Sequence, residues 1–316
     1  MKKINLLAVL ALAATPAFLQ AQTTNYSDVV GYQKIDLPYG GKAVAPTFIK
    51  PNVFQGQATI SGSSVTVSPG ALSGLSLGPT SFSAPVTNFP RFYAEIVSTN
   101  SSYYGYNFDI TAANTADGFT SANIPAGLSG SVSLAIREHV TLADLDPANM
   151  SDGDSVTIYD SQGNSSTYYQ ASASWVDSNG TPGFAHVPIY PGTGFIFAGQ
   201  SQANTITVKG TVKNTPTAVP VYINAYANIV AAVNPSASVN YANQDLASAI
   251  GDGAAFTRYT SDGSFVEEST FYAAGGQVYD SNGNLTSTAS VAGGEAVNVG
   301  SLSADTVWIA PAAISK

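Results

Sequence analysis

The stretch from Gly153 to Gly180, GDSVTIYDSQGNSSTYYQASASWVDSNG, decides the fold of this chain. In it, β-branched and aromatic residues alternate with small polar ones, and Gly and Asn separate the alternating runs. Alternation with a period of two is typical of strands that bury one face, and Asn-Gly is a strong signal for a hairpin turn because both residues tolerate positive φ. The stretch therefore predicts antiparallel strands joined by tight turns.

The same alternation extends over most of the chain, and helical periodicity is scarce. Strands are expected at residues 57–60, 65–67, 91–97, 106–111, 132–136, 155–159, 166–169, 194–197 and 205–208. Only residues 141–145 and 244–250 indicate short helices, the second ended by Gly251. The sequence thus predicts an all-β fold with very little helix.

The pattern of the opening stretch returns about 100 residues later. Asp144-Leu145, Tyr159, Gly163, Tyr168-Tyr169 and Asp177-Ser-Asn-Gly180 have counterparts, in the same order, at Asp245-Leu246, Tyr259, Gly263, Phe271-Tyr272 and Asp280-Ser-Asn-Gly283. A repeat of this length is domain-sized and too long for a solenoid unit. It predicts two related β-sandwich-like lobes.

Four segments follow from this interpretation. We expect a signal peptide over residues 1–21, an N-terminal β module over residues 22–135, a first β lobe over residues 136–210 and a second, related lobe over residues 211–316. Whether the two lobes share one core is left open by the sequence.

The start of the mature chain also parallels the segment before the second lobe. Ile35-Asp-Leu-Pro-Tyr39 with Val44-Ala-Pro46 matches Ile223-Asn-Ala-Tyr226 with Val230-Ala-Ala-Val-Asn-Pro235. Residues 50–130 have no such counterpart and are expected to form an inserted hairpin module.

The N-terminus has the features of a secretory signal peptide. Lys2 and Lys3 precede an uncharged apolar run that ends near Leu19, and Leu19-Gln20-Ala21 provides a cleavage site before Gln22. The run is shorter than the ~20 residues of a spanning helix. We expect an extracytoplasmic protein, either secreted, at the cell surface or in the periplasm, without a transmembrane helix after cleavage.

Composition restricts the partners and the means of stabilisation. The mature chain has nine basic and 20 acidic residues, a net charge of −11, which disfavours nucleic acid and anionic lipid. There is no cysteine, so neither disulfides nor thiolate metal sites are possible. Hydrophobic residues make up 44% of the chain, which is typical of a packed protein rather than a disordered one.

Several short motifs resemble those of one protein family. They are Asp28-Val-Val-Gly-Tyr32 with Ile35-Asp-Leu-Pro38, Phe92-Tyr-Ala-Glu-Ile96 with Phe108-Asp-Ile-Thr111, Thr141-Leu-Ala-Asp-Leu145, and Ile189-Tyr-Pro-Gly-Thr-Gly-Phe195. In these the chain resembles a paralogous family of secreted β-rich proteins of unknown function from Verrucomicrobia-type bacteria. The second lobe departs from the pattern, with Ala292-Gly-Gly-Glu-Ala296 in place of a Pro-Gly-Ser-Gly-Phe type segment. The resemblance implies export and architecture but no chemistry.

Two motifs that carry catalysis elsewhere are weak here. Gly74-Leu-Ser-Leu-Gly78 matches the hydrolase nucleophile elbow, but Pro79 follows at once and prevents the helix that this elbow requires. His139 and His186 are isolated, and a zinc site needs three or four ligands. Either histidine would suit an acid or base, but a surface or strand-end role is the more common one.

The acidic residues also lack a recognisable site pattern. Asp144, Asp146, Asp152 and Asp154 form the densest run, without the alternating Asp spacing of a calcium loop, so turn positions are expected. The five glutamates are Glu95, Glu138, Glu267, Glu268 and Glu295, and no motif pairs two of them across a cleft as in a glycosidase. We therefore predict no catalytic, cofactor-binding or metal-binding residues, and no cofactor.

Three functional hypotheses remain. The first is an exported, non-enzymatic surface or extracellular β protein with a structural or adhesive role. The second is a carbohydrate-binding or carbohydrate-active protein, in which Tyr103, Tyr104, Tyr106 or Trp175 would stack on sugar rings. The third is an outer-membrane barrel, which the closing segment Trp308–Lys316 disfavours because Pro311 interrupts it. Cell-surface components or polysaccharide are the expected partners.

Export with cleavage is directly testable. The protein released or surface-bound by its native host is expected to begin at Gln22, as intact-mass measurement and N-terminal sequencing would show. Recovery of the chain in the cytoplasm with residues 1–21 still attached would contradict this prediction.

Overall fold

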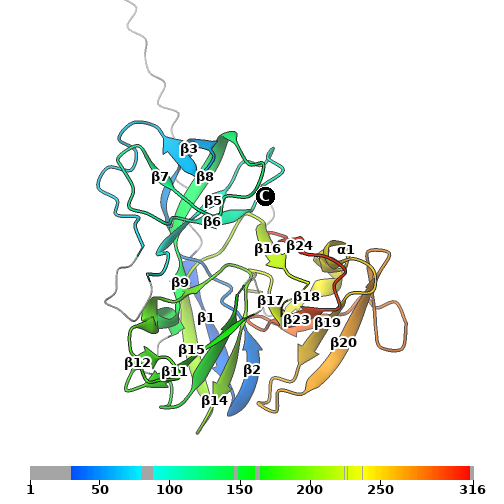
Figure 1. The fold of residues 1–316 in the computed structure, drawn as a ribbon. Coiled ribbons are helices and arrows are strands. Elements are labelled where there is room, and N and C mark those ends of the chain that lie inside the picture. The colour runs from blue at the N-terminus through cyan, green and yellow to red at the C-terminus, as the bar shows by residue number, and fades with distance from the viewer. Residues whose placement is uncertain are drawn as a thin grey trace, which may run out of the picture.

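A computed structural model describes residues 30–79, 88–145, 149–160, 164–223, 225, 227–236 and 238–313. The signal peptide and Asp146 lie outside them. Within these residues the fold is all-β, as predicted, and the strands pair into three groups that Figure 1 shows as three bodies in contact. We call these groups the first lobe, the insertion module and the second lobe.

The three groups are defined by their elements. The first lobe comprises β1 (Val30–Leu37), β2 (Gly40–Val44), β9 (Val140–Thr141), η1 (Leu142–Leu145), β10 (Ser155–Tyr159), β11 (Ser165–Ala171), β12 (Ser174–Val176), η3 (Phe184–His186), β13 (Pro188–Ile189), β14 (Phe195–Gly199) and β15 (Asn204–Thr211). The insertion module comprises β3 (Asn52–Ser61), β4 (Ser64–Val67), β5 (Phe92–Ile96), β6 (Asn107–Asp109), β7 (Gly118–Thr120) and β8 (Gly130–Glu138). The second lobe comprises β16 (Thr217–Val221), β17 (Asn228–Val230), β18 (Ser238–Asn240), η4 (Tyr241–Asn243), α1 (Leu246–Ile250), β19 (Ala255–Tyr259), β20 (Glu267–Ala274), β21 (Gln277–Tyr279), β22 (Ser290–Ala292), β23 (Val297–Gly300) and β24 (Thr306–Ala310).

The strands within residues 22–135 are divided between two of the three groups. β1 pairs with β15, and β2 pairs with β14, so both strands belong to the first lobe. Only β3 to β8, within residues 52–138, form the six-stranded sheet of the insertion module. The beginning of the chain therefore contributes its strands to the first lobe.

The strand order of the first lobe recurs in the second. The five-stranded sheet of the first lobe has the order β12-β11-β10-β14-β2, and that of the second has the order β21-β20-β19-β23-β17. The two-stranded pairs β1–β15 and β9–β13 likewise match β16–β24 and β18–β22. The two predicted helices occupy matching places as well, as η1 and α1.

The strand registers agree residue by residue. Val156 lies opposite Tyr168 and Phe197, and its counterpart Phe256 lies opposite Phe271 and Val299. All six side chains are buried, because alternate residues of each strand face the core. The neighbouring residues on these strands are threonines, and their hydroxyls form a hydrogen bond in each lobe. The distance is 2.9 Å between Thr157 and Thr167 and 3.0 Å between Thr257 and Thr270.

The two Asp-Ser-Asn-Gly turns also match, but they are not the Asn-Gly turns that we expected. Only the glycines have positive φ, 77° at Gly180 and 79° at Gly283. The carboxylate of Asp177 accepts hydrogen bonds from the amides two and four residues later, at 2.9 and 2.8 Å, and Asp280 does the same at 2.9 Å each. The aspartate side chain thus supplies the turn's hydrogen bonds, and the asparagine keeps ordinary backbone angles.

The two lobes meet through matching backbone hydrogen bonds. The amide of Ala45 donates to Gly294 O at 2.9 Å, and the amide of Ala231 donates to Gly192 O at 2.9 Å. Since Ala45 corresponds to Ala231 and Gly192 to Gly294, the same bond occurs twice with the lobes exchanged. This reciprocity is that of a two-fold symmetric contact within one chain.

A second reciprocal pair completes the contact. Gly194 N donates to Ile229 O at 2.7 Å, and Ala296 N donates to Ala43 O at 3.2 Å. Apolar side chains, mostly alanines, fill the space around these bonds, namely Ala43, Ala45, Ala227, Ile229, Ala231 and Ala296. The Pro-Gly-Thr-Gly-Phe segment and its alanine-containing counterpart therefore form the junction between the lobes.

Gly194 is required by this close approach. A Cβ atom on Gly194 would lie 2.7 Å from both the Cβ of Ala296 and the Cγ2 of Ile229, and 2.9 Å from Val44 O. Such distances are well below ordinary van der Waals contact. Position 194 and its counterpart 296 face each other, so the contact accommodates a methyl group on one side only.

We expect Gly194→Ala to lower the free energy of unfolding by about 1–3 kcal/mol, because the added methyl overpacks the junction. Adding Ala296→Gly removes the facing methyl and should restore part of the loss. The measurement is urea unfolding of the mature protein. Gly300→Ala is the control, since nothing lies within 4 Å of its added Cβ. Equal effects of Gly194→Ala and Gly300→Ala would contradict the proposed packing.

Candidate ligand-binding cleft

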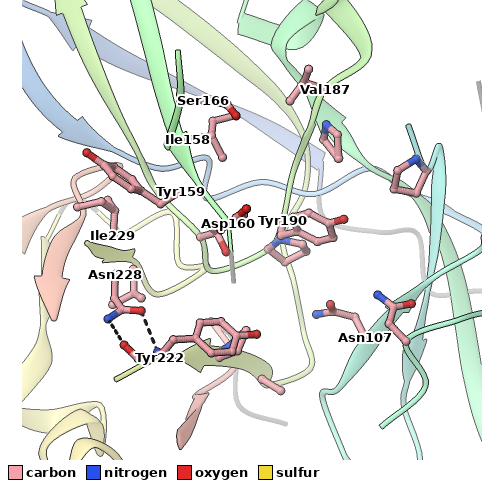
Figure 2. A pocket seen from close by; sticks show the side chains of 18 of the residues that line it. Asn107, Ile158, Tyr159, Asp160, Ser166, Val187, Tyr190, Tyr222, Asn228 and Ile229 are labelled. Atoms are coloured by element: carbon pink, nitrogen blue, oxygen red, sulfur yellow. Dashed lines mark hydrogen bonds between the residues drawn. The ribbon is translucent and has the colours of Figure 1, made fainter. Parts of the chain in front are cut away.

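A cleft of about 660 Å³ lies where the three groups of strands meet. Its wall takes Phe89, Tyr106 and Asn107 from the insertion module and its flanking segment. Residues of β10, β11 and the segment around Pro188 come from the first lobe, and residues of β16 and β17 come from the second. Figure 2 shows the side chains converging on this space. Its size is within the range of small-molecule binding sites.

Aromatic rings and neutral polar groups line the cleft. Its five tyrosines are Tyr106, Tyr159, Tyr168, Tyr190 and Tyr222, and its polar residues include Asn107, Asn123, Ser166, Thr193 and Asn228. Among the described lining residues Asp160 is the one charged side chain, and none is cationic. Tyrosine combines an apolar face with a polar tip, so the lining suits a ligand with apolar surfaces and hydroxyl groups.

Asn228 holds one wall of the cleft in place. Its Oδ1 accepts from the amide of Tyr222 at 2.9 Å, and its Nδ2 donates to Tyr222 O at 2.9 Å (Figure 2). The same Nδ2 also donates to Val299 O at 3.1 Å. With these bonds the asparagine fixes the backbone that carries the Tyr222 ring. Asn228 is therefore a positioning residue.

A hydrogen bond to the buried carboxylate of Asp109 holds the Tyr190 side chain in place. Its hydroxyl donates to Asp109 Oδ2 at 2.7 Å, and His139 Nε2 lies 3.0 Å from Asp109 Oδ1. The His139 ring packs against Tyr93 and Tyr190, with centroids 4.8 and 4.9 Å away. Burial and the adjacent Asp109 raise the pKa of Tyr190 far above its usual range, so the phenol remains a neutral hydrogen-bond donor.

A buried ion cluster attaches the insertion module to the connection between the lobes. Glu95 on β5 is 0% exposed and accepts from Lys213 Nζ, from the Thr215 hydroxyl and, at 3.2 Å, from Arg137 Nε on β8. Lys213 and Thr215 lie between β15 and β16, where the chain passes from one lobe to the other. The Ala218 amide, which follows, donates to Gly105 O at 3.0 Å. These contacts fix the module beside the cleft.

The charge of Glu95 depends on its two cationic neighbours. Burial alone would raise the pKa of this carboxyl, but Lys213 and Arg137 outweigh it and lower the pKa below its usual range. Glu95 is thus held ionised, and its stabilising contribution is present above the carboxyl's ordinary pKa. That contribution is lost as pH falls through the lowered value.

The two histidines lie in different surroundings. His139 is buried against Asp109, whereas His186 ends η3, is exposed, and lines a separate hollow together with Ser76, Arg91 and Glu138. Residues 74–78 contain no strand and no helix, so Ser76 does not lie at a nucleophile elbow.

The acidic residues accept hydrogen bonds in turns or ion pairs. Asp144 accepts from the Thr141 amide, Asp152 from that of Ser172, and Asp154 from those of Ser151 and Gln200. Besides Glu95, the glutamates pair with Arg91, Thr270, Arg258 and Lys42. Within the described part of the chain, no three acidic or histidine side chains converge as metal ligands would.

The aromatic residues singled out in the sequence divide into two kinds. Tyr106 lines the cleft, whereas Tyr103 and Tyr104 lie outside its lining, and the Tyr103 hydroxyl donates to Ala126 O at 2.7 Å. Trp175 is 1% exposed and donates to Leu142 O at 2.8 Å, so it belongs to the core of the first lobe. Tyr190, Tyr222 and Asn228 carried no signal as site residues, since only the meeting of the three groups brings them together.

Comparisons with family models, with characterised proteins and with solved structures found no match. The helical segments that the structure describes are too short to traverse a bilayer.

We expect Glu95→Gln to lower the free energy of unfolding at pH 7 by about 3–5 kcal/mol, because it leaves Lys213 and Arg137 buried without their carboxylate. The wild type should lose stability as pH falls below about 4.5, and the variant should lose less over the same interval. Chemical unfolding between pH 3 and 7 provides the measurement.

Arg91→Ala serves as the control for this prediction. It breaks the half-exposed pair with Glu138, which should cost less than about 1 kcal/mol. Similar losses in the two variants would contradict the role assigned to the cluster.

Proposed function

We propose that this chain is an exported, non-enzymatic surface or extracellular β protein with an adhesive role, and that it holds its ligand in the cleft between the three groups of strands. The observation that carries the proposal is the cleft itself, a space of about 660 Å³ lined by five tyrosines. A cleft lined by rings and a few polar groups is the usual form of a binding site. The signal peptide expected over residues 1–21 supports action outside the cytoplasm.

The state of the acidic groups favours binding over catalysis. Asp109, behind the cleft wall, already interacts with Tyr190 and His139, and Glu95 is enclosed by Lys213 and Arg137. Asp160, the charged side chain of the described lining, accepts hydrogen bonds from the amide and the side chain of Asn164 at 2.9 and 3.1 Å. A catalytic acid or base must reach the substrate's proton, and these carboxylates are turned toward their own partners. The role of these carboxylates is to hold the residues that form the cleft wall in place.

We further propose that the two lobes derive from duplication of one unit of about 100 residues, as the internal repeat suggests. The shared strand order and the reciprocal hydrogen bonds support this origin. On this account the insertion module is the later addition that closed the cleft on its third side.

Binding to the native host's own surface tests the function. Labelled mature protein is incubated with washed cells and with extracellular material of the native host, and the retained fraction is measured against concentration. Tyr106→Ala/Tyr222→Ala removes two rings from the cleft and should weaken retention about tenfold or more, equivalent to ~1.4 kcal/mol.

Tyr32→Ala is the matched control, because Tyr32 is 65% exposed and lies outside the cleft lining. It should bind as the wild type does. Unfolding curves establish that each variant is folded. Equal retention of all three proteins would contradict binding in the cleft.

A further inference from the structure

Two exposed lysines lie together on one face of the first lobe. β1 and β15 pair in register, with Tyr32 opposite Lys209 and Lys34 opposite Thr207. Directly opposite residues point to the same side of a sheet, as do residues two apart on one strand. Tyr32, Lys34 and Lys209 therefore share a face, and all three side chains are exposed. Val30, 75% exposed, extends this face at the start of β1. We call Val30, Tyr32, Lys34 and Lys209 the basic face.

The two lysines of the basic face have no carboxylate partner. The other lysines and arginines in the described part of the chain all form ion pairs, namely Lys42 with Glu295, Lys50 with Asp144, Arg91 with Glu138, Arg137 and Lys213 with Glu95, and Arg258 with Glu268. Among the described residues, Lys34 and Lys209 belong to no such pair. They are therefore available to an anionic partner.

The opposite combination of charge and apolar surface occurs on a loop of the second lobe. The loop from Thr260 to Val266 joins β19 to β20 and is closed by the Thr260 amide, which donates to Val266 O at 2.9 Å. Val266 is 57% exposed, and Asp262 and Glu267 beside it are exposed as well. Neither carboxylate pairs with a cation in the described part of the chain. We call Asp262, Val266 and Glu267 the acidic tip.

The charge of the second lobe strengthens the contrast between the two surfaces. Residues 217–313 contain eight acidic residues and one basic residue, Arg258, a net charge of −7. Hydrogen bonds from Ser264 lower the pKa of Asp262 below its usual range, so this carboxyl is ionised at neutral pH. An exposed apolar side chain between two carboxylates complements an exposed tyrosine ring beside two lysines.

The basic face and the acidic tip of one molecule are held apart. The Gly41 amide, just after the turn that follows β1, donates to Gly263 O at 2.8 Å, so the tip lies at the Leu37 end of β1. Tyr32 is five residues before Leu37, and a strand of that length spans about 17 Å. A contact between face and tip therefore joins two copies of the chain. Because the two surfaces differ, each copy keeps one of them free for a further copy, which makes the contact heterologous.

We propose that the protein associates with itself in rows, with the basic face of one copy bound to the acidic tip of the next. In this contact the apolar side chains of the face cover Val266, while the two lysines pair with the two carboxylates. Exposed ion pairs contribute little each, so a single contact is weak. Rows form where many copies are held close together, as on a surface. This inference does not involve the cleft and is tested independently of ligand binding.

Sedimentation equilibrium of the mature protein over a range of concentrations measures the association. At about 0.1 M salt the Debye length is ~10 Å, so repulsion between the acidic molecules is screened while charges in contact still attract. We expect the average mass to rise with concentration beyond that of a dimer. At about 1 M salt, where the Debye length is ~3 Å, it should return to that of the monomer. A plateau at the dimer, or association that high salt leaves unchanged, would contradict the proposal.

Charge exchange tests which surfaces are in contact. Lys34→Glu/Lys209→Glu makes the face acidic, and Asp262→Lys/Glu267→Lys makes the tip basic. Each variant alone then has a face and a tip of like charge and should remain monomeric. Mixed in equal amounts, the two variants again present unlike charges at every contact and should form rows in which they alternate. Recovery in the mixture also shows that both variants are folded.

Ala274→Lys/Gln277→Lys is the matched control. These two exposed residues lie opposite each other at the end of β20 that is remote from Glu267. The change adds positive charge to the same lobe but leaves the tip intact, so association should stay within about twofold of the wild type.

Three outcomes would overturn the proposal. The first is a control that loses association as the tip variant does. The second is a mixture that stays monomeric although unfolding curves show both variants to be folded. The third is a monomeric wild type that binds alginate through Lys34 and Lys209, which would assign the basic face to an anionic polymer instead of a second copy.

Discussion

The reciprocal backbone contact between the two lobes is the constraint on which the rest of the structure depends. Each lobe donates to and accepts from the other through residues that are glycines or alanines, apart from Ile229. A larger side chain at the junction would separate the sheets and remove hydrogen bonds from buried amides, which is costly. The cleft lies beside this junction, and its lining includes Thr193 and Ile229 from the two lobes.

A contact of a different kind secures the third wall of the cleft. Glu95, Arg137 and Lys213 are withdrawn from water, and their mutual attraction offsets the desolvation only while all three remain together. The insertion module is therefore held at a specific place on the inter-lobe connection rather than by apolar packing alone. Directional contacts of this type keep the walls of a binding site in register.

Local sequence patterns predicted most of the fold and little of the site. Alternation located the strands, and the second occurrence of Asp-Ser-Asn-Gly marked the matching lobe. The alternation does not predict the burial of β5, Phe92–Ile96. Every residue of this strand is buried, whereas the sequence pattern would place Glu95 at an exposed position. Lys213, the partner of Glu95, is 118 residues away in the sequence, and no local sequence pattern predicts that the two side chains meet. Tyr190, Tyr222 and Asn228 were missed for the same reason, because their meeting depends on packing between the lobes.

Native-state amide exchange at the junction tests the central claim most directly. If the lobes form one body, the amides of Ala45, Gly194, Ala231 and Ala296 will exchange only on global unfolding, with the same free energy as core amides of β10 and β19. They will also respond to denaturant as those core amides do. Rapid exchange of these four amides, insensitive to denaturant while β10 and β19 stay protected, would mean that the lobes separate in solution and would contradict the account.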